Sequence, residues 1–299
     1  MKTIIIAGGT GFLGQSIEKY FSNLGYEIKI LTRKPLKENH IYWDAQTLND
    51  WTTNIENADV LINLTGKSVD CRYNAKNKKL IYDSRINSTT ILGKAVQQCK
   101  QPPKLWMNAS TATIYRYSLD KEMTELDGEF GNDFSMNIAK SWEKAFSEID
   151  TPNTRKIILR TSIVLGKKAG AFIPLKTLTK LGMGGKQGSG KQKVSFIHEL
   201  DFVRAVEFLI QNQTLNGAFN ITVPKPTNNK HLMKTFRKEL GIPFGIPQPE
   251  WILKIGSKII GTEPELVLKS RNVIPQRLLN EGFQFNYPTI EKTIKNLIL

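Results

Sequence analysis

Residues 1–32 decide the fold, and they read MKTIIIAGGTGFLGQSIEKYFSNLGYEIKILT. The run Thr3–Ala7 is short, apolar and rich in β-branched side chains, which is typical of a buried parallel strand. A glycine-rich turn follows, and after it apolar side chains recur at helical spacing. Gly25 stands where helices commonly end, and residues 26–32 again have strand character. The stretch therefore predicts a strand, a glycine turn, a helix and a second strand.

The glycine-rich turn has a physical reason to bind a dinucleotide. Glycines let the backbone turn tightly and approach a pyrophosphate, and the helix N-terminus offers unpaired N–H groups and the positive end of its dipole. The motif alone is a weak indication, but between a strand and a helix it is a strong one. The alternative is a turn that binds no ligand. We predict dinucleotide binding through Gly8, Thr10, Gly11, Phe12, Leu13 and Gly14.

The end of the second strand usually selects the nucleotide. An acidic side chain there would hydrogen-bond the ribose 2′-hydroxyl of NAD. This chain has Thr32, Arg33 and Lys34 instead, and two cations without a carboxylate suit a 2′-phosphate. The sequence therefore favours NADP over NAD. The alternative is that Arg33 stacks on the adenine or is simply solvated.

The middle of the chain continues the alternation of strands and helices. Apolar runs predict strands at 58–65, 104–108 and 156–165, and amphipathic runs predict helices at 84–99 and 134–149. This order is typical of a doubly wound parallel α/β sheet with right-handed crossovers. Ligands of such sheets bind beyond the carboxyl ends of the strands. We therefore expect Asn63, Leu64, Thr65 and Gly66 on the cofactor side.

Composition excludes several classes of protein. The 299 residues are 40% hydrophobic and 23% charged, as in ordinary globular domains, and no apolar run approaches the roughly 20 residues of a transmembrane helix. The apolar run at the N-terminus is too short for a signal peptide, so we expect a cytoplasmic protein. Two cysteines and three scattered histidines give no metal-site spacing. The net charge of +15 permits an acidic partner, but scattered lysines argue against nucleic acid.

The second half supplies the expected substrate side. Residues 170–193 hold several glycines and cannot form one regular helix. A strand is predicted at 217–223 and a helix at 228–240. Asp201 precedes an amphipathic run and is interpreted as its N-terminal cap, and His198 is interpreted as a structural residue.

Motifs along the whole chain point to one family. The chain resembles the extended short-chain dehydrogenase/reductases, the sugar-nucleotide epimerase-like group, and within it an atypical branch with its own short C-terminal domain. The motifs that carry the resemblance are GGTGFLG (8–14), NLTG (63–66), DSRI (83–86), STATIY (110–115), LGMGG (181–185), GSGKQ (188–192), SFIHELD (195–201), FNITVP (219–224), Arg271, Pro275 and GFQF (282–285). The resemblance implies a Rossmann sheet with a smaller C-terminal α/β region on the substrate side, and it adds Ala109 and Ser110 to the cofactor site.

The resemblance also implies a catalytic Ser or Thr, a Tyr and a Lys, and the chain departs from that set. Thr111 matches the hydroxyl position. The Tyr-x-x-x-Lys motif should lie upstream of Glu143, but its two positions hold Ser135 and Ala139. Lys140 is one residue away, about 100° around a helix axis. The usual dyad is therefore absent, and the general acid–base group must come from elsewhere.

Three further residues are candidates for the site. Tyr115 is the best substitute acid–base group by its position, and packing is the equal alternative. Arg85 is a candidate for binding an anionic group of the substrate, with a helix-surface salt bridge as the alternative. Gln192 is a candidate for contact with the substrate.

The domain organisation follows from the resemblance. We expect an NADP-binding domain at 1–165, with a returning contribution from about 194–224. The substrate-side region should comprise 166–193 and 225–299, with a small helical domain at 248–299. A homodimer is the default expectation.

Three functions remain open at this point. The first is an NADP-dependent oxidoreductase or epimerase that acts on a small hydroxylated or nucleotide-linked substrate. The second is a non-catalytic NADP-binding protein that regulates or binds a partner, which the missing dyad favours. The third is binding of nucleic acid or of an anionic surface through the basic charge.

Overall fold

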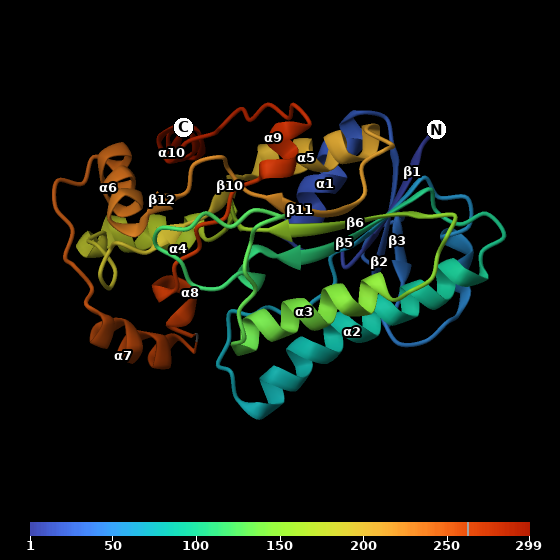
Figure 1. Cartoon of the computed structure of the whole chain (residues 1–299), viewed down its shortest axis with the longest axis horizontal. Helices are drawn as coiled ribbons and strands as arrows, with labels where there is room; N and C mark the ends of the chain where they lie inside the picture. The colour runs from blue at the N-terminus through green and yellow to red at the C-terminus, as the bar shows by residue number, and fades with distance from the viewer. Residues whose placement is uncertain (262) are drawn as a thin grey trace.

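A seven-stranded parallel sheet forms the centre of the molecule (Figure 1). The computed structural model describes residues 1–261 and 263–299. The strand order is β11-β6-β5-β4-β1-β2-β3, and every neighbouring pair is parallel. The strands are β1 (Thr3–Ala7), β2 (Glu27–Thr32), β3 (His40–Tyr42), β4 (Val60–Asn63), β5 (Leu105–Thr111), β6 (Arg155–Thr161) and β11 (Gly217–Ile221). The doubly wound Rossmann sheet predicted from the sequence is confirmed.

Helices cover both faces of this sheet. Helices α1 (Phe12–Asn23) and α5 (Glu199–Gln211) pack on one face, and α2 (Ala75–Gln98) and α3 (Phe134–Ser147) on the other (Figure 1). The strands are apolar on both faces for this reason: Ile4 and Ile6 belong to the core under α1, whereas Ile5 and Ala7 belong to the core over α2. Burial of each isoleucine side chain contributes about 1.5–3 kcal/mol.

Helix α2 begins nine residues earlier than the predicted start at residue 84. The Asn74 side chain accepts a hydrogen bond from Asn77 N and caps the helix. The first two turns are mostly exposed, because they extend beyond the sheet, so they carry no apolar stripe that a periodicity argument could detect. The basic residues Lys76, Lys78 and Lys79 lie on these turns.

The predicted strand 156–165 is in fact two strands. The chain bends at Ser162, whose backbone N–H and hydroxyl both donate to Ile221 O. After the bend, β7 (Ile163–Gly166) leaves the main sheet and joins a small sheet with β8 (Ala169–Gly170) and β10 (Phe196–His198). The glycine-rich segment forms α4 (Phe172–Leu178) and a π-helical turn rather than one regular helix, as expected.

The predicted cap at Asp201 is wrong. Helix α5 begins at Glu199, and the cap is His198, whose Nδ1 accepts from Leu200 N. Asp201 is fully buried and accepts from Asn286 N and Tyr287 N, so its carboxylate holds the C-terminal segment. His198 is also a structural residue: its ring stacks on Tyr287 with centroids 3.9 Å apart.

The C-terminal residues cover three separate places. Helix α7 (Glu250–Ile260) and α8 (Glu265–Leu268) lie beyond the carboxyl ends of the strands, α9 (Gln276–Asn280) packs on β11, and α10 (Ile290–Ile298) packs on α6 (Asn229–Leu240) (Figure 1). Strands β9 (Lys193–Val194) and β12 (Thr227–Asn228) pair with each other as a two-stranded antiparallel sheet. The predicted domain boundaries stay a prediction.

Candidate functional site

The glycine turn is held at the carboxyl edge of β1 by close packing. Gly8 adopts φ +72°, a conformation that favours glycine. A Cβ atom on Gly14 would lie 2.2 Å from Gly9 O, so helix α1 can start this close to the turn only with glycine at that position. Gly11 faces open space, and a Cβ atom there would have nothing within 4 Å. The first turn of α1 therefore has room for a ligand at its N-terminus.

The end of β4 lies directly beside this turn. Buried Asn63 donates to Thr89 Oγ1 and Asn108 Oδ1, and its own Oδ1 accepts from Thr65 N. Thr65 Oγ1 lies 2.9 Å from where a Cβ on Gly8 would be. This hydroxyl is buried and has no hydrogen-bond partner among the described residues, which is costly unless a ligand supplies one.

The cations expected to select the nucleotide are exposed at the end of β2. Thr32 is buried and its Oγ1 accepts from Lys34 N, so the backbone is fixed while the side chains of Arg33 and Lys34 face solvent. Within the described part of the chain, neither cation forms a salt bridge.

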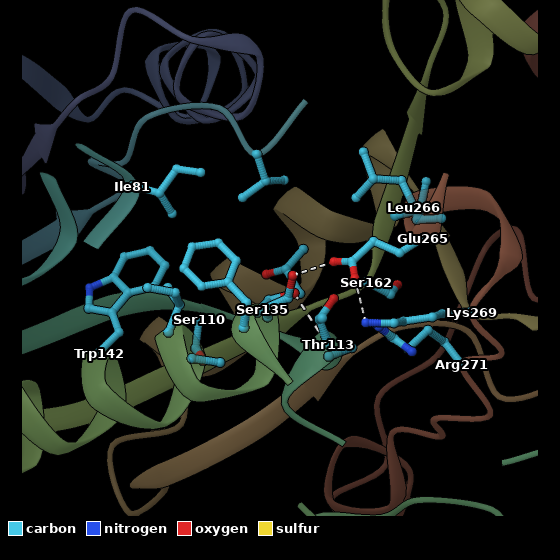
Figure 2. A pocket seen from close by; sticks show the side chains of 18 of the residues that line it. Ile81, Ser110, Thr113, Ser135, Trp142, Ser162, Glu265, Leu266, Lys269 and Arg271 are labelled. Atoms are coloured by element: carbon cyan, nitrogen blue, oxygen red, sulfur yellow. Dashed lines mark hydrogen bonds and ion pairs between the residues drawn. The ribbon is translucent and has the colours of Figure 1, made fainter. Parts of the chain in front are cut away.

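A cavity of about 360 Å³ opens beyond the carboxyl end of β5 (Figure 2). Thr111 lies on its wall, and its Oγ1 accepts from Thr113 N, which leaves the hydroxyl proton free to donate. Ser135 and Ala139, the positions where the usual Tyr and Lys would stand, line the same cavity. The structure thus brings Thr111 and both dyad positions together. Ser110 also lines it, but its hydroxyl donates to Glu143 Oε1 at 2.6 Å.

A polar cluster occupies the side of the cavity that faces the C-terminal segment. Ser135 Oγ donates to Glu265 Oε1 at 2.7 Å, and Lys269 Nζ donates to Glu265 Oε2 at 2.6 Å (Figure 2). Lys269 also pairs with Asp133, which caps α3 by accepting from Met136 N. The Tyr73 hydroxyl lies 3.5 Å from Ser135 Oγ. Burial raises the pKa of Tyr73, so the phenol stays protonated at neutral pH.

Tyr115 lies in the core and does not line the cavity. It is fully buried, its hydroxyl donates to Asn220 Oδ1 at 3.0 Å, and it accepts from Arg160 Nη1 at 2.8 Å. Burial raises the pKa of Tyr115 despite the adjacent Arg160 guanidinium. Arg160 in turn forms a two-point ion pair with Glu143. This position suits the packing alternative and not the acid–base role.

The two candidate substrate contacts are placed differently. Arg85 lines the cavity, and its guanidinium carbon lies 5.0 Å from the centre of the Trp142 ring. No surface salt bridge is found for Arg85 among the described residues. Gln192 is buried elsewhere: its Nε2 donates to Gln187 O and Val267 O, and it does not line the cavity.

Of the cavity residues that were missed or not assigned a role from the sequence, four carry a titratable side chain: Tyr73, Glu265, Lys269 and Arg271. Arg271 is part of a family motif, but no local pattern marks the other three. Glu265, Lys269 and Arg271 lie in residues 263–271, which we call the closing segment. The closing segment contacts the part of the cavity wall that carries Tyr73, because Tyr73 N donates to Glu263 Oε1.

The sheet, the glycine turn and the adjoining cavity define a Rossmann-type protein of the extended short-chain dehydrogenase/reductase class. A model described as the NAD dependent epimerase/dehydratase family matches residues 4–222, and a domain of unknown function, DUF1731, matches residues 248–297. The chain belongs to the NAD-dependent epimerase/dehydratase family.

Relatives and solved structures agree with this membership. The epimerase family protein YfhF of Bacillus subtilis is 33% identical over 99% of this chain and 97% of its own length. The human epimerase family protein SDR39U1 is 29% identical over 99% of both chains. The crystal structure of human SDR39U1 with NADPH has a TM-score of 0.90, with 28% identity and 99% of each chain covered. UDP-N-acetylglucosamine 4-epimerase from Bacillus cereus shares the fold, with a TM-score of 0.78 and 16% identity over 100% of this chain and 96% of that one.

Two further observations concern metals and membranes. In residues 1–261 and 263–299, no group of three or more His, Cys, Asp or Glu side chains is placed to hold a metal ion. No helix within those ranges is both long enough and apolar enough to cross a bilayer.

Proposed function

We propose that this chain is an NADPH-dependent oxidoreductase or epimerase-like enzyme that acts on a small hydroxylated or carbonyl substrate. The observation that carries the proposal is the cavity at the end of β5, with the Thr111 hydroxyl on its wall. The cavity adjoins the glycine turn through a chain of contacts: Gly8 packs on Thr65, and Gly66 packs on Arg85. A ligand at the turn would therefore reach the cavity.

The residues of the nucleotide edge, which we define as 8–14, 32–34 and 63–66, fit NADPH. The glycine turn would hold the pyrophosphate against the start of α1, and the unpartnered Thr65 hydroxyl would gain a hydrogen-bond partner. Arg33 and Lys34 would pair with the 2′-phosphate. When bound, NADPH supplies a hydride, and the protein supplies orientation and electrostatics.

The cavity residues would handle the oxygen of the substrate. The Thr111 hydroxyl is free to donate a hydrogen bond to that oxygen and to orient it. Tyr73 is the candidate proton donor, because it is protonated and lies beside the position of the missing tyrosine. Ser135 and Glu265 would position the phenol and the Lys269 ammonium.

The second candidate function is a non-catalytic NADPH-binding protein. Ser135 and Ala139 at the dyad positions favour it, since serine cannot act as the tyrosine acid–base group and alanine cannot hold a ribose or tune a tyrosine as lysine does.

Both proposals require the glycine turn to bind a nucleotide, and titration with NADPH and NADH tests this. We expect NADPH to bind more tightly, to enhance nicotinamide fluorescence, and at one hundred times Kd to stabilise the fold by about 2.7 kcal/mol. Oxidation of bound NADPH is then followed by the loss of its absorbance with a panel of carbonyl compounds. Turnover that falls at least tenfold in Thr111→Val and Tyr73→Phe, with NADPH affinity kept, supports the enzyme. Binding without turnover supports the second candidate, and no binding of either nucleotide contradicts both.

A further inference from the structure

The fold collects the excess positive charge of the chain at one end of the molecule. Residues 166–198 contain seven lysines and no acidic residue, and residues 225–261 contain six lysines, one arginine and two glutamates. These two ranges, which we call the basic end, hold +12 of the net charge of +15 in less than a quarter of the chain. They include α4, α6 and α7, which lie at the same end of the molecule in Figure 1. Charge of one sign, concentrated in this way, indicates a partner of the opposite sign.

Helix α7, within the basic end, presents apolar and basic side chains together to solvent. One face of the helix carries four exposed side chains at the i, i+3, i+4 and i+7 positions: Trp251, Lys254, Ile255 and Lys258. Trp251 is 63% exposed and Ile255 is 53% exposed, whereas Ser257, outside this face, is buried. Helices that lie in the interface of a bilayer combine the same two kinds of side chain.

Further exposed apolar side chains stand in the segment that leads into α7. Phe244 is 62% exposed and Ile246 is 59% exposed. This segment packs on the π-helical turn, because Ile246 N donates to Gly182 O at 2.8 Å and the Phe244 ring lies 3.3 Å from where a Cβ on Gly182 would be. Leu181, next to that glycine, is also exposed. Ile246 and Trp251 are five residues apart, which limits the separation of their Cα atoms to about 18 Å.

The chemistry of the basic end fits an anionic lipid surface better than other partners. A second copy of the chain would bring another charge of +12 against the same face, which opposes self-association there. Nucleic acid is bound largely through arginines and aromatic stacking, whereas the basic end has one arginine and most of its exposed apolar side chains are aliphatic. At a bilayer, apolar side chains enter the headgroup and acyl boundary while lysines stay beside the lipid phosphates.

We propose that the basic end docks on an anionic lipid bilayer, with Trp251 and Ile255 of α7 entering the headgroup region and Phe244 and Ile246 beside them. The attachment is peripheral, because α7 has 11 residues and no helix in residues 1–261 and 263–299 is long and apolar enough to cross a bilayer. The inference is independent of the proposed function, since none of these four side chains belongs to the nucleotide edge or lines the cavity.

Tryptophan fluorescence of the full-length protein tests the docking at a known residue. Of the five tryptophans only Trp251 is exposed, because the other four are at most 5% exposed: Trp43, Trp51, Trp106 and Trp142. The probes are vesicles of phosphatidylcholine alone and vesicles with equal parts of phosphatidylglycerol. We expect the emission to shift to the blue only with the anionic vesicles, and lipids with brominated acyl chains should quench it, because Trp251 enters the bilayer.

Cosedimentation with the same vesicles gives the affinity and tests the apolar side chains. Trp251→Ser combined with Ile255→Ser should lower the affinity for anionic vesicles at least about tenfold. Phe244→Ser should lower it by a smaller factor. Leu126→Ser is the matched control, since Leu126 is 80% exposed and lies outside the basic end, and its affinity should stay unchanged. All of these positions are exposed, so the variants should fold, which thermal unfolding checks.

Charge reversal tests the lysines of α7 separately. Lys254 pairs with exposed Glu250 at 2.7 Å, whereas Lys258 forms no ion pair within the described part of the chain. Lys254→Glu combined with Lys258→Glu should lower the affinity for anionic vesicles at least about tenfold. The matched control is Lys94→Glu combined with Lys100→Glu, which reverses two exposed charges outside the basic end and should change the affinity less than about twofold.

Three outcomes overturn the inference. The first is that anionic vesicles do not bind at low salt. The second is binding that salt abolishes, without a blue shift or quenching and with equal affinity in the Trp251 and Ile255 double variant, because that is adsorption by charge alone. The third is a shift of the Trp251 emission with duplex DNA or with protein concentration but not with vesicles, which assigns this face to nucleic acid or to a second copy. NADPH binding enters none of these outcomes, so the proposed function stands or fails separately.

Discussion

The nucleotide edge and the closing segment are built in opposite ways. The nucleotide edge comprises residues 8–14, 32–34 and 63–66, and each part lies at the carboxyl end of a strand whose register the parallel sheet fixes. The closing segment has only the four-residue helix α8, and polar contacts attach it. Three of these contacts use a side chain, namely Tyr73 N to Glu263 Oε1, Ser135 Oγ to Glu265 Oε1 and Ser195 Oγ to Arg271 O, and one joins two backbones, Arg271 N to Lys193 O. Backbone geometry therefore positions one half of the site, and long-range polar contacts position the other.

The largest effect should come from Arg160→Met, which breaks a buried polar network shared by the sheet and α3. Arg160 pairs with Glu143 at 2.7 Å and supports Tyr115, which in turn bonds Asn220. Removal of one partner leaves a buried charge, so we expect a loss of about 3–5 kcal/mol in the free energy of unfolding in urea. Lys144→Met removes a cation from an exposed pair and should cost under about 0.5 kcal/mol. A loss below about 1 kcal/mol in Arg160→Met would mean that this network does not hold the molecule together.

Gly14→Ala should damage the nucleotide edge alone. The new Cβ would meet the Gly9 carbonyl at 2.2 Å, so the start of α1 must shift, at a cost of about 1–3 kcal/mol. NADPH binding, followed by fluorescence, should weaken strongly. Gly11→Ala, in the same turn but facing open space, is the matched control for stability. Equal unfolding curves for the two variants would contradict the packing argument.

Arg33→Ala combined with Lys34→Ala should alter the choice of nucleotide and little else. Hydrogen bonds to charged groups contribute about 1.5–3 kcal/mol, so we expect NADPH affinity to fall about tenfold or more, with NADH affinity unchanged. Both side chains are exposed, so thermal unfolding without ligand should not change. A parallel loss of affinity for both nucleotides would show that these residues contact the shared adenosine instead.

The smallest effect should be a pH dependence at His198, which attaches the C-terminal segment to α5. Burial lowers the pKa of His198, and its Nε2 bonds Asn296 Oδ1 at 3.1 Å. Below the ordinary pKa of about 6.5 the histidine binds a proton in the unfolded chain but stays neutral in the folded protein. The free energy of unfolding therefore has its full value above that pH and declines as the pH falls toward the lowered pKa.

His198→Gln should flatten this decline between about pH 7.5 and about pH 5.5, measured by urea unfolding at each pH. His231→Gln, at an exposed position beside Glu291, should not flatten it. An identical decline in wild type and His198→Gln would assign the pH dependence to other groups.

The same contrast explains what could be predicted from the sequence. The sheet, the glycine turn and the location of Thr111 follow from strand periodicity and from the rule that ligands lie at the carboxyl edge. The start of α2 could not be predicted, because its first turns pack against little and carry no apolar stripe. Tyr115 was ambiguous for a related reason: only the fold reveals that Arg160 and Asn220 enclose its hydroxyl.

The cavity wall could not be predicted because its parts are remote in the chain. Tyr73 lies beside Ser135, and Ser135 bonds Glu265, only after the sheet, α3 and the C-terminal segment have assembled. No spacing within one segment records such a contact. Gln192 illustrates the converse, since its place after a glycine run suggests a ligand contact, whereas its amide is used to bond Gln187 and Val267.

The position of Arg271 in the chain has a consequence for biosynthesis. Ribosomes add about 5–20 residues per second, and domains form from the N-terminus as the chain emerges. The strand that ends at Thr111 is made about 160 residues before Arg271, which at those rates is an interval of about ten to thirty seconds. A nascent chain thus contains its nucleotide edge well before the closing segment is made and can complete the cavity wall. A product terminated before residue 263 would present that cavity open to solvent, with Arg85 as its only arginine among the described lining residues.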